Sequence, residues 1–230
     1  MAAHAARRRR DILVALLAVT TGSVDAISFL RFGGVFTSVM TANMVLLGVT
    51  AGQQNGARAL RTGVAFAGYI LSALAASRFN REPAEPARVW PARVTATLAA
   101  EAVILLAVTA GWEAAGGQPR GAAQLWLLAA AAVAMGFQAA AVRALGEPGL
   151  SSTYLTGTLT SVLGNIAAGR GVSSVRRSVA ILVLLVAGAA VSSVLVLHAP
   201  RVVPAVPVAF LLAVITVAAS SRWPGSGGRP

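Results

Sequence analysis

Residues 22–48 read GSVDAISFLRFGGVFTSVMTANMVLLG, and the rest of the chain is interpreted outward from this stretch. An aspartate, Asp25, stands inside an apolar run, and a Gly33-Gly34 break follows it. The short apolar segment after the break carries four hydroxyl or amide side chains, Thr37, Ser38, Thr41 and Asn43. An acid and a broken polar segment are costly in lipid, so they usually mark a cavity or a pathway.

The composition is typical of a polytopic α-helical membrane protein. The chain has 230 residues, of which 57% are hydrophobic and 11% are charged, and its mean hydropathy is +0.74. A soluble domain carries about 25% charged residues, and a single membrane anchor needs only about 20 residues. A β-barrel is disfavoured because the apolar runs are continuous rather than alternating.

The pattern therefore predicts an all-α fold, a transmembrane helical bundle of about six spanning helices. The expected spans are residues 12–30, 59–79, 93–112, 124–145, 178–197 and 202–220. Two shorter segments, residues 35–51 and 152–169, carry hydroxyl and amide side chains and are each preceded by a glycine break, so we expect them to be broken or re-entrant. At 1.5 Å per residue the first of them reaches about 25 Å, which is marginal for spanning a membrane.

Charge and residue types argue against several function classes. The net charge is +12 and all 19 basic residues are arginines, which favours contact with anionic headgroups at the cytoplasmic face. Nucleic-acid binding is disfavoured because no basic soluble domain or known motif is present. No cysteine and only two isolated histidines, His4 and His198, occur, so neither a metal site nor a cofactor is expected. Enzyme motifs are lacking, although a lipid-modifying enzyme stays a third alternative.

The two halves of the chain resemble one another at a shift of about 115 residues. Gly22 corresponds to Gly136, and the first glycine break corresponds to residues 146–149. The tetrapeptide at 39–42, VMTA, corresponds to YLTG at 154–157. Each half thus has a long helix, a break, a threonine-containing short segment and two further helices. The alternative is that some of these identities arise by chance, because the chain is rich in Ala, Gly and Thr.

Arginine placement predicts the topology. Basic loops are retained in the cytoplasm, and Arg7–Arg10 place the N-terminus there. If neither short segment spans, a larger share of the arginines becomes cytoplasmic than if both span. Each half then has three spans, so the halves are inverted, with both termini cytoplasmic. The Ala/Arg-rich, Lys-free composition suggests a bacterial plasma membrane.

The expected organisation is a basic tail at 1–11, one transmembrane domain at 12–220 and a flexible tail at 221–230. The two halves of the domain are 12–113 and 121–220.

Only two acids, Asp25 and Glu101, fall inside apolar segments. A charged carboxylate at mid-membrane costs about 2.5–3.5 kcal/mol or more, so each acid must be protonated, paired or hydrated. Glu101 could pair with Arg93, and the two acids could face one cavity. The candidate substrate- or ion-binding set is Asp25, Thr37, Thr41, Asn43, Glu101, Thr156 and Thr158.

The alternative is structural. Thr and Ser commonly bond back to their own helix, and Gln138 could bond across helices.

The leading functional hypothesis is a small-solute or ion transporter with a polar site at the midplane, in which Asp25 is the coupling acid and Thr41 and Asn43 lie beside it. A proton or a small solute would be its cargo. The alternative is a non-transporting membrane scaffold or accessory subunit, which predicts a dry interior and a fixed partner. The sequence leaves the oligomeric state open.

The segments GSVDAISF at 22–29, GGVF at 33–36 and MTANMVLLG at 40–48 resemble the YoaK-type family of bacterial integral membrane proteins, which carry a domain of unknown function. The second-half segments at 136–140 and 156–158 are similar to it as well, so the resemblance covers about residues 12–220. It implies a polytopic inner-membrane protein and no particular substrate. Two residues depart from the family pattern, Ala42 where glycine is common and Ala139 where asparagine is expected.

Overall fold

The computed structural model describes residues 2–81, 89–146, 155–169, 175–221 and 223. All of its regular elements in these ranges are helices: α1 (Ala2–Arg31), α2 (Met40–Gly52), α3 (Gly56–Phe79), α4 (Ala92–Ala114), α5 (Gly121–Ala144), α6 (Leu155–Ala167), α7 (Arg176–His198), a 3-10 turn at Pro200–Val202, and α8 (Ala205–Ser220). Six of these helices are long and apolar enough to cross a membrane: α1, α3, α4, α5, α7 and α8 (extended N-terminally by the 3-10 turn). The predicted all-α bundle is therefore confirmed, with helix bounds within a few residues of the expected ones at most ends.

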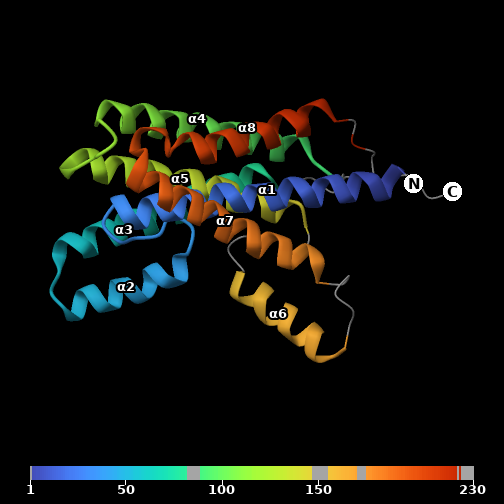
Figure 1. Ribbon diagram of the computed structural model, residues 1–230, viewed down its shortest axis with the longest axis horizontal. Helices are drawn as coiled ribbons and strands as arrows, with labels where there is room; N and C mark the ends of the chain where they lie inside the picture. Colours follow the sequence, from blue (N-terminus) through green and yellow to red (C-terminus); the bar gives the residue numbers. More distant parts are fainter. Residues whose placement is uncertain (1, 82–88, 147–154, 170–174, 222, 224–230) are drawn as a thin grey trace.

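The six long helices run side by side, and the two short helices lie outside this bundle (Figure 1). α1 packs along α7 and α8, while α5 packs along α3 and α4. α4 and α8 also touch, and α1 crosses α5. Each short helix packs mainly on one long helix, α2 on α3 and α6 on α7. In the view of Figure 1, α2 lies near one end of the molecule and α6 near the other.

The core lies where α1, α4, α5 and α8 meet. Side chains there are fully or almost fully buried, for example Leu17, Leu98, Leu128 and Leu211. By contrast, the outward faces of α3, α6 and α7 carry exposed large apolar side chains such as Leu71, Leu163 and Val186. An apolar exterior of this kind is suited to lipid rather than to water.

Close helix contacts depend on glycine at two crossings. A Cβ at Gly22 of α1 would lie 2.0 Å from the Leu185 carbonyl oxygen of α7. A Cβ at Gly136 of α5 would lie 2.6 Å from the Tyr69 carbonyl oxygen of α3. Small residues let membrane helices approach closely because no side chain separates the backbones.

Both described ends of the chain lie at the same end of the bundle. Arg9 near the start of α1 donates a hydrogen bond to Ser221 Oγ just after α8, at 3.0 Å. Trp90, before α4, stacks on Trp223, with 5.4 Å between the ring centroids. At the opposite end Trp112 Nε1 donates to the Pro200 carbonyl oxygen at 2.8 Å.

Two expectations about the ends of the chain need adjustment. Residues 2–11, expected as a tail, continue α1 as helix, because alanine and arginine are both strong helix formers. In the expected tail 221–230, Trp223 is held by its stack and by a hydrogen bond to the Ala218 carbonyl oxygen. Most other residues of that tail, residues 82–88 of the proline-rich loop, and the expected start of the second short segment at 152 lie outside the described residues.

Candidate functional site

The chain reverses direction directly after α1. Gly34 donates from its backbone N–H to the Phe29 carbonyl oxygen at 3.0 Å, and Ser28 Oγ donates to the Val35 carbonyl oxygen at 2.7 Å. Gly33 and Gly34 have φ values of 94° and 74°, a region that glycine enters without steric cost. The segment 35–39 therefore runs back alongside the last turns of α1, so α2 begins partway along the bundle (Figure 1).

Asp25 fastens the returning segment to α1. Its Oδ1 accepts hydrogen bonds from the Thr37 backbone N–H at 2.8 Å, the Thr37 hydroxyl at 2.8 Å and the Ser38 backbone N–H at 2.9 Å. Its Oδ2 accepts a hydrogen bond from the Ser38 hydroxyl. The side chain is buried. The carboxyl group thus satisfies two backbone N–H groups that would otherwise be buried without partners.

Asn43 fastens the same segment from the side of α2. Its Oδ1 accepts from the Phe36 backbone N–H at 3.1 Å, and its Nδ2 donates to the Phe36 carbonyl oxygen at 2.6 Å. Phe36 also stacks on Phe29 of α1, with centroids 5.1 Å apart. Together, Asp25, Thr37, Ser38 and Asn43 form one polar cluster, called the Asp25 cluster below.

These contacts explain why the short helix starts later than expected. The sequence pattern predicted helix from residue 35, but α2 starts at Met40. The backbone N–H groups of Phe36, Thr37 and Ser38 donate to the side chains of Asn43 and Asp25, so they do not enter a helical ladder. Of the two residues expected beside Asp25, Asn43 holds the same returning segment, whereas Thr41 is exposed on α2 and Thr37 bonds to Asp25 in its place.

The other members of the candidate set lie elsewhere. Thr41 and Thr156, near the starts of α2 and α6, are exposed. Thr158 is buried, and its hydroxyl has no partner among the described residues. Ser38 was in the quoted stretch but not in the candidate set, although it supplies two of the four hydrogen bonds to Asp25. Its position directly after Thr37 was the signal, since consecutive backbone donors can share one acceptor.

Glu101 is separate from the Asp25 cluster. It lies in the middle of α4 with 0% exposure, and neither carboxyl oxygen has a hydrogen-bond partner among the described residues. Arg93, its expected partner, instead donates to the carbonyl oxygens of Phe79 at 3.3 Å and Arg81 at 2.8 Å. The expected Glu101–Arg93 pair is therefore not formed.

Gln138 joins two helices, as predicted. Its Nε2 donates to the Leu17 carbonyl oxygen at 3.2 Å and to the Thr21 hydroxyl at 2.6 Å, so α5 is bonded to α1. Its Oε1 is buried and has no partner among the described residues.

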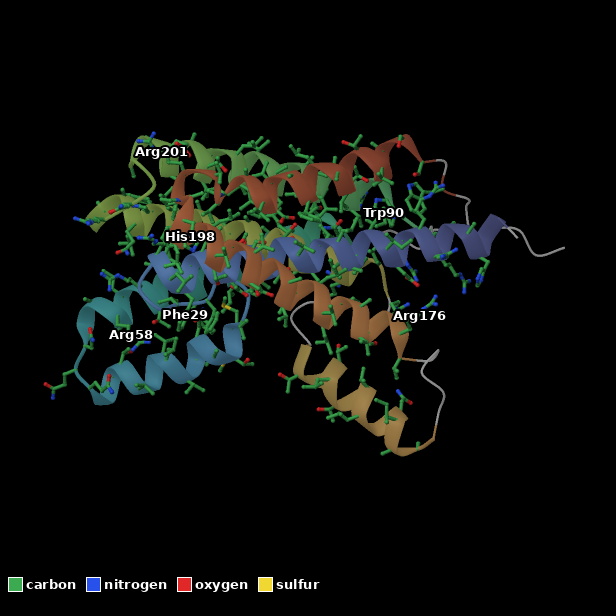
Figure 2. All side chains as sticks on the ribbon, viewed as in Figure 1. Phe29, Arg58, Trp90, Arg176, His198 and Arg201 are labelled. Atoms are coloured by element: carbon green, nitrogen blue, oxygen red, sulfur yellow. The ribbon has the colours of Figure 1, made fainter. Side chains whose placement is uncertain are left out.

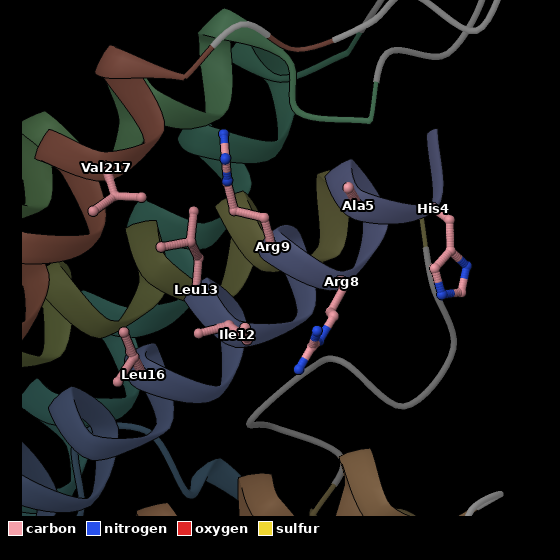
Figure 3. Close-up of a pocket in the computed structure, with 8 residues that line it drawn as sticks. All are labelled: His4, Ala5, Arg8, Arg9, Ile12, Leu13, Leu16 and Val217. Carbon is pink, nitrogen blue, oxygen red and sulfur yellow. The ribbon is translucent and has the colours of Figure 1, made fainter. Parts of the chain in front are cut away.

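A large cavity lies apart from these polar groups. It is an open groove of about 750 Å³ between the N-terminal part of α1 and the end of α8. Figure 3 shows Arg8 and Arg9 near its rim, with Ile12, Leu13 and Val217 along it. A second, narrow void of about 20 Å³ lies among α1, α4, α5 and α8 and has a mainly apolar lining. Neither is lined by Asp25 or Glu101, so the cavity expected to join both acids is absent from these two.

Metal-binding geometry is also lacking in the described ranges. No group of three or more His, Cys, Asp or Glu side chains there could hold a metal ion.

The six membrane-length helices, the apolar exterior and the polar clusters enclosed between helices define a polytopic α-helical integral membrane protein. The chain belongs to the family described as "Protein of unknown function (DUF1275)", which it matches over residues 13–218. It is 36% identical over 157 residues to the UPF0700 transmembrane protein YoaK of Bacillus subtilis (strain 168), which covers 68% of this chain and 67% of that protein. No solved structure matches the chain. The family resemblance predicted from the residues around Asp25 is thereby confirmed.

Proposed function

We propose that this protein transports a small solute or ion, and that the pathway runs between two related halves of opposite orientation. The halves are α1–α4 and α5–α8. The observation that carries the proposal is the pattern of helix packing. Inverted repeats with broken helices between them are a recurring design of secondary transporters.

The main helix contacts are retained when each helix is replaced by its counterpart in the other half. The contact between α1 and α7 corresponds to the contact between α5 and α3. Likewise, the contact between α1 and α8 corresponds to the contact between α5 and α4. The contact between α2 and α3 corresponds to the contact between α6 and α7. The α4–α8 and α1–α5 contacts each join two counterpart helices, so the exchange leaves them the same. A set of contacts that exchanges in this way is expected of a pseudo-two-fold axis and is improbable for unrelated halves.

The glycine crossings support the same relation at the level of residues. Gly22 approaches Leu185 and Ala189 of α7, and Gly136 approaches Tyr69 and Ala73 of α3. Leu185 lies 116 positions after Tyr69, and Ala189 lies 116 positions after Ala73. This shift is close to that of the sequence repeat. Corresponding backbones therefore make corresponding contacts in both halves.

The short helices have the positions expected of re-entrant segments. Each has 13 residues, or about 20 Å, which is too short for a hydrocarbon core of about 30 Å. α2 lies near the end of the bundle at which α1 stops, and α6 near the end at which α5 stops (Figure 1). Because α1 and α5 stop at opposite ends, the two segments enter from opposite faces.

In a membrane we place both described chain ends in the cytoplasm of a bacterial cell. Arg7–Arg10 belong to the start of α1 at that end. Trp90 and Arg176 lie toward the same end, whereas Arg58, His198 and Arg201 lie toward the other (Figure 2). The positive-inside rule favours this orientation. The groove beside Arg8 and Arg9 then opens at the cytoplasmic interface, where anionic headgroups lie.

Within this framework the Asp25 cluster is one gate of the pathway. Asp25 and Asn43 hold segment 35–39 closed against α1. When these bonds are released, the hydroxyl groups of Thr37 and Ser38 become available to a solute. Thr158, the counterpart of Asn43, contributes the buried hydroxyl of the other half. Thr41 and Thr156 are exposed on the outside of their helices and take no part in binding.

The test is solute flux into proteoliposomes, with substrates first selected by thermal stabilisation against a solute panel. Asp25→Asn retains an oxygen acceptor for Thr37 and Ser38 but removes the charge. We expect insertion and folding to persist and flux to be lost. Normal flux by Asp25→Asn, or a misfolded variant, contradicts the assigned role of Asp25.

A second candidate is a non-transporting membrane scaffold. The observation in its favour is that all four hydrogen bonds to Asp25 come from the protein itself, while the void in the core is apolar. The scaffold predicts co-purification of one fixed partner and no stabilisation by any solute, whereas the transporter predicts solute-dependent stabilisation that Asp25→Asn abolishes.

A further inference from the structure

A buried acid without a hydrogen-bond partner among the described residues lies inside the bundle. Glu101 stands ten residues into α4, with no exposed surface and no hydrogen bond to either oxygen among the described residues. An isolated carboxylate in a low-dielectric interior costs several kcal/mol. Burial of this kind therefore favours the neutral acid over the carboxylate at Glu101.

The elements around Glu101 offer no neighbouring charge. α8 has no charged residue in its bounds Ala205–Ser220, and the only charged residue of α5 is Arg143 at its exposed end. On α4 itself, Arg93 is held by loop carbonyl groups, and Glu113 is exposed at the far end. On α1, the charged residues Arg7–Asp11 and Arg31 lie toward its two ends, and Asp25 is saturated by Thr37 and Ser38.

Gln138 Oε1, an acceptor without a donor among the described residues, lies at about the same height along the bundle as Glu101. Val24 of α1, Leu105 of α4 and Ala131 of α5 line the same narrow void. Thr21 precedes Val24 by about one turn of α1, and Glu101 precedes Leu105 by about one turn of α4. Gln138 bonds to Thr21, and its own Oε1 has no donor in the part of the chain that the structure describes.

We propose that Glu101 and Gln138 form a proton-binding site at the midplane of the bundle. A proton from the aqueous phase adds to one Glu101 carboxyl oxygen, and the resulting O–H supplies the donor that Gln138 Oε1 lacks. Release of that proton requires water or a cation to reach the carboxylate, so proton occupancy is tied to opening of the bundle. The inference rests on the proposed transport function and names the proton as its coupling ion.

Infrared spectroscopy of the purified, lipid-reconstituted protein tests the site directly, because a protonated carboxyl group has a C=O band separate from that of a carboxylate. We expect this band in the wild-type protein at neutral pH and its loss in Glu101→Gln. Gln138→Leu should shift the band to higher wavenumber, since the carboxyl group loses its acceptor. Glu113→Gln, at the exposed end of the same helix, should leave it unchanged.

A band that is identical in the wild type and in correctly folded Glu101→Gln overturns the proposal, as does a band insensitive to Gln138→Leu. The spectra do not depend on transport. A Glu101-dependent band in a protein without solute flux therefore refutes the transport proposal alone. Solute flux that persists in Glu101→Gln and moves no protons refutes proton coupling alone.

Discussion

At the scale of single residues, Asp25 organises the loop after α1. A carboxylate can accept about four hydrogen bonds, and four are made to Asp25 by only two residues, Thr37 and Ser38. The same side chain thus closes the loop onto α1 by accepting from the backbone of residues 37 and 38. In the structure, Asp25 is therefore a group that holds the loop in place.

The stability of the loop should depend on the acceptor at position 25 more than on its charge. Asp25→Ala leaves the Thr37 and Ser38 N–H groups buried without acceptors, and we expect a loss of about 2–4 kcal/mol in the free energy of unfolding. Asp25→Asn should lose much less, because its oxygen still accepts. Thermal unfolding in detergent measures both, with Glu113→Gln as a control at an exposed position. Equal losses for the two Asp25 variants would contradict the assignment.

The sequence was sufficient to identify Asp25 and Asn43, because an acid and an amide inside apolar segments are rarely without a role. It could not separate Thr37 from Thr41. Both are threonines beside the break, but Thr37 lies in the extended return and is buried, whereas Thr41 lies on the first turn of α2 and is exposed. That distinction depends on the start of the helix, which is set by side-chain contacts to the backbone rather than by local propensity.

At the scale of helices, two crossings fix the bundle. Gly22→Ala and Gly136→Ala each place a methyl group against a backbone carbonyl of the facing helix. Backbone cannot move aside as a flexible side chain can, so we expect each substitution to cost about 1–3 kcal/mol of stability.

Gly63→Ala and Gly157→Ala are matched controls, since nothing lies within 4 Å of a Cβ at either position. These two should be neutral or stabilising, because alanine favours helix over glycine by about 1 kcal/mol. The comparison uses thermal unfolding of the four purified variants. Tolerance of alanine at both Gly22 and Gly136 would show that the α1–α7 and α5–α3 approaches are looser than described.

Helix periodicity and length predicted the six long helices because each must fill a membrane-length apolar span. The sequence did not predict which helices pack against one another. Gly22 and Gly136 could be aligned with one another, but their contacts with Leu185 and Tyr69 depend on which helices meet. Only the packed structure supplies that information.

At the scale of the whole molecule, the central claim is that α2 and α6 re-enter from opposite faces of an inverted pair. The chain contains no cysteine, so single cysteines can be introduced without first replacing native ones. In each half, one cysteine before the short helix and one after it report whether that helix spans. Suitable positions are Leu30 and Gln53 in the first half and Arg143 and Ala168 in the second, all exposed.

The most direct measurement is labelling of these four variants in intact cells by a thiol reagent that does not cross the membrane. We predict that Leu30→Cys and Gln53→Cys react from outside, and that Arg143→Cys and Ala168→Cys react only after the membrane is opened. Reaction of Leu30→Cys and Gln53→Cys from opposite faces would mean that α2 spans the membrane. Reaction of all four from one face would mean that the halves are not inverted, and either result would contradict the account.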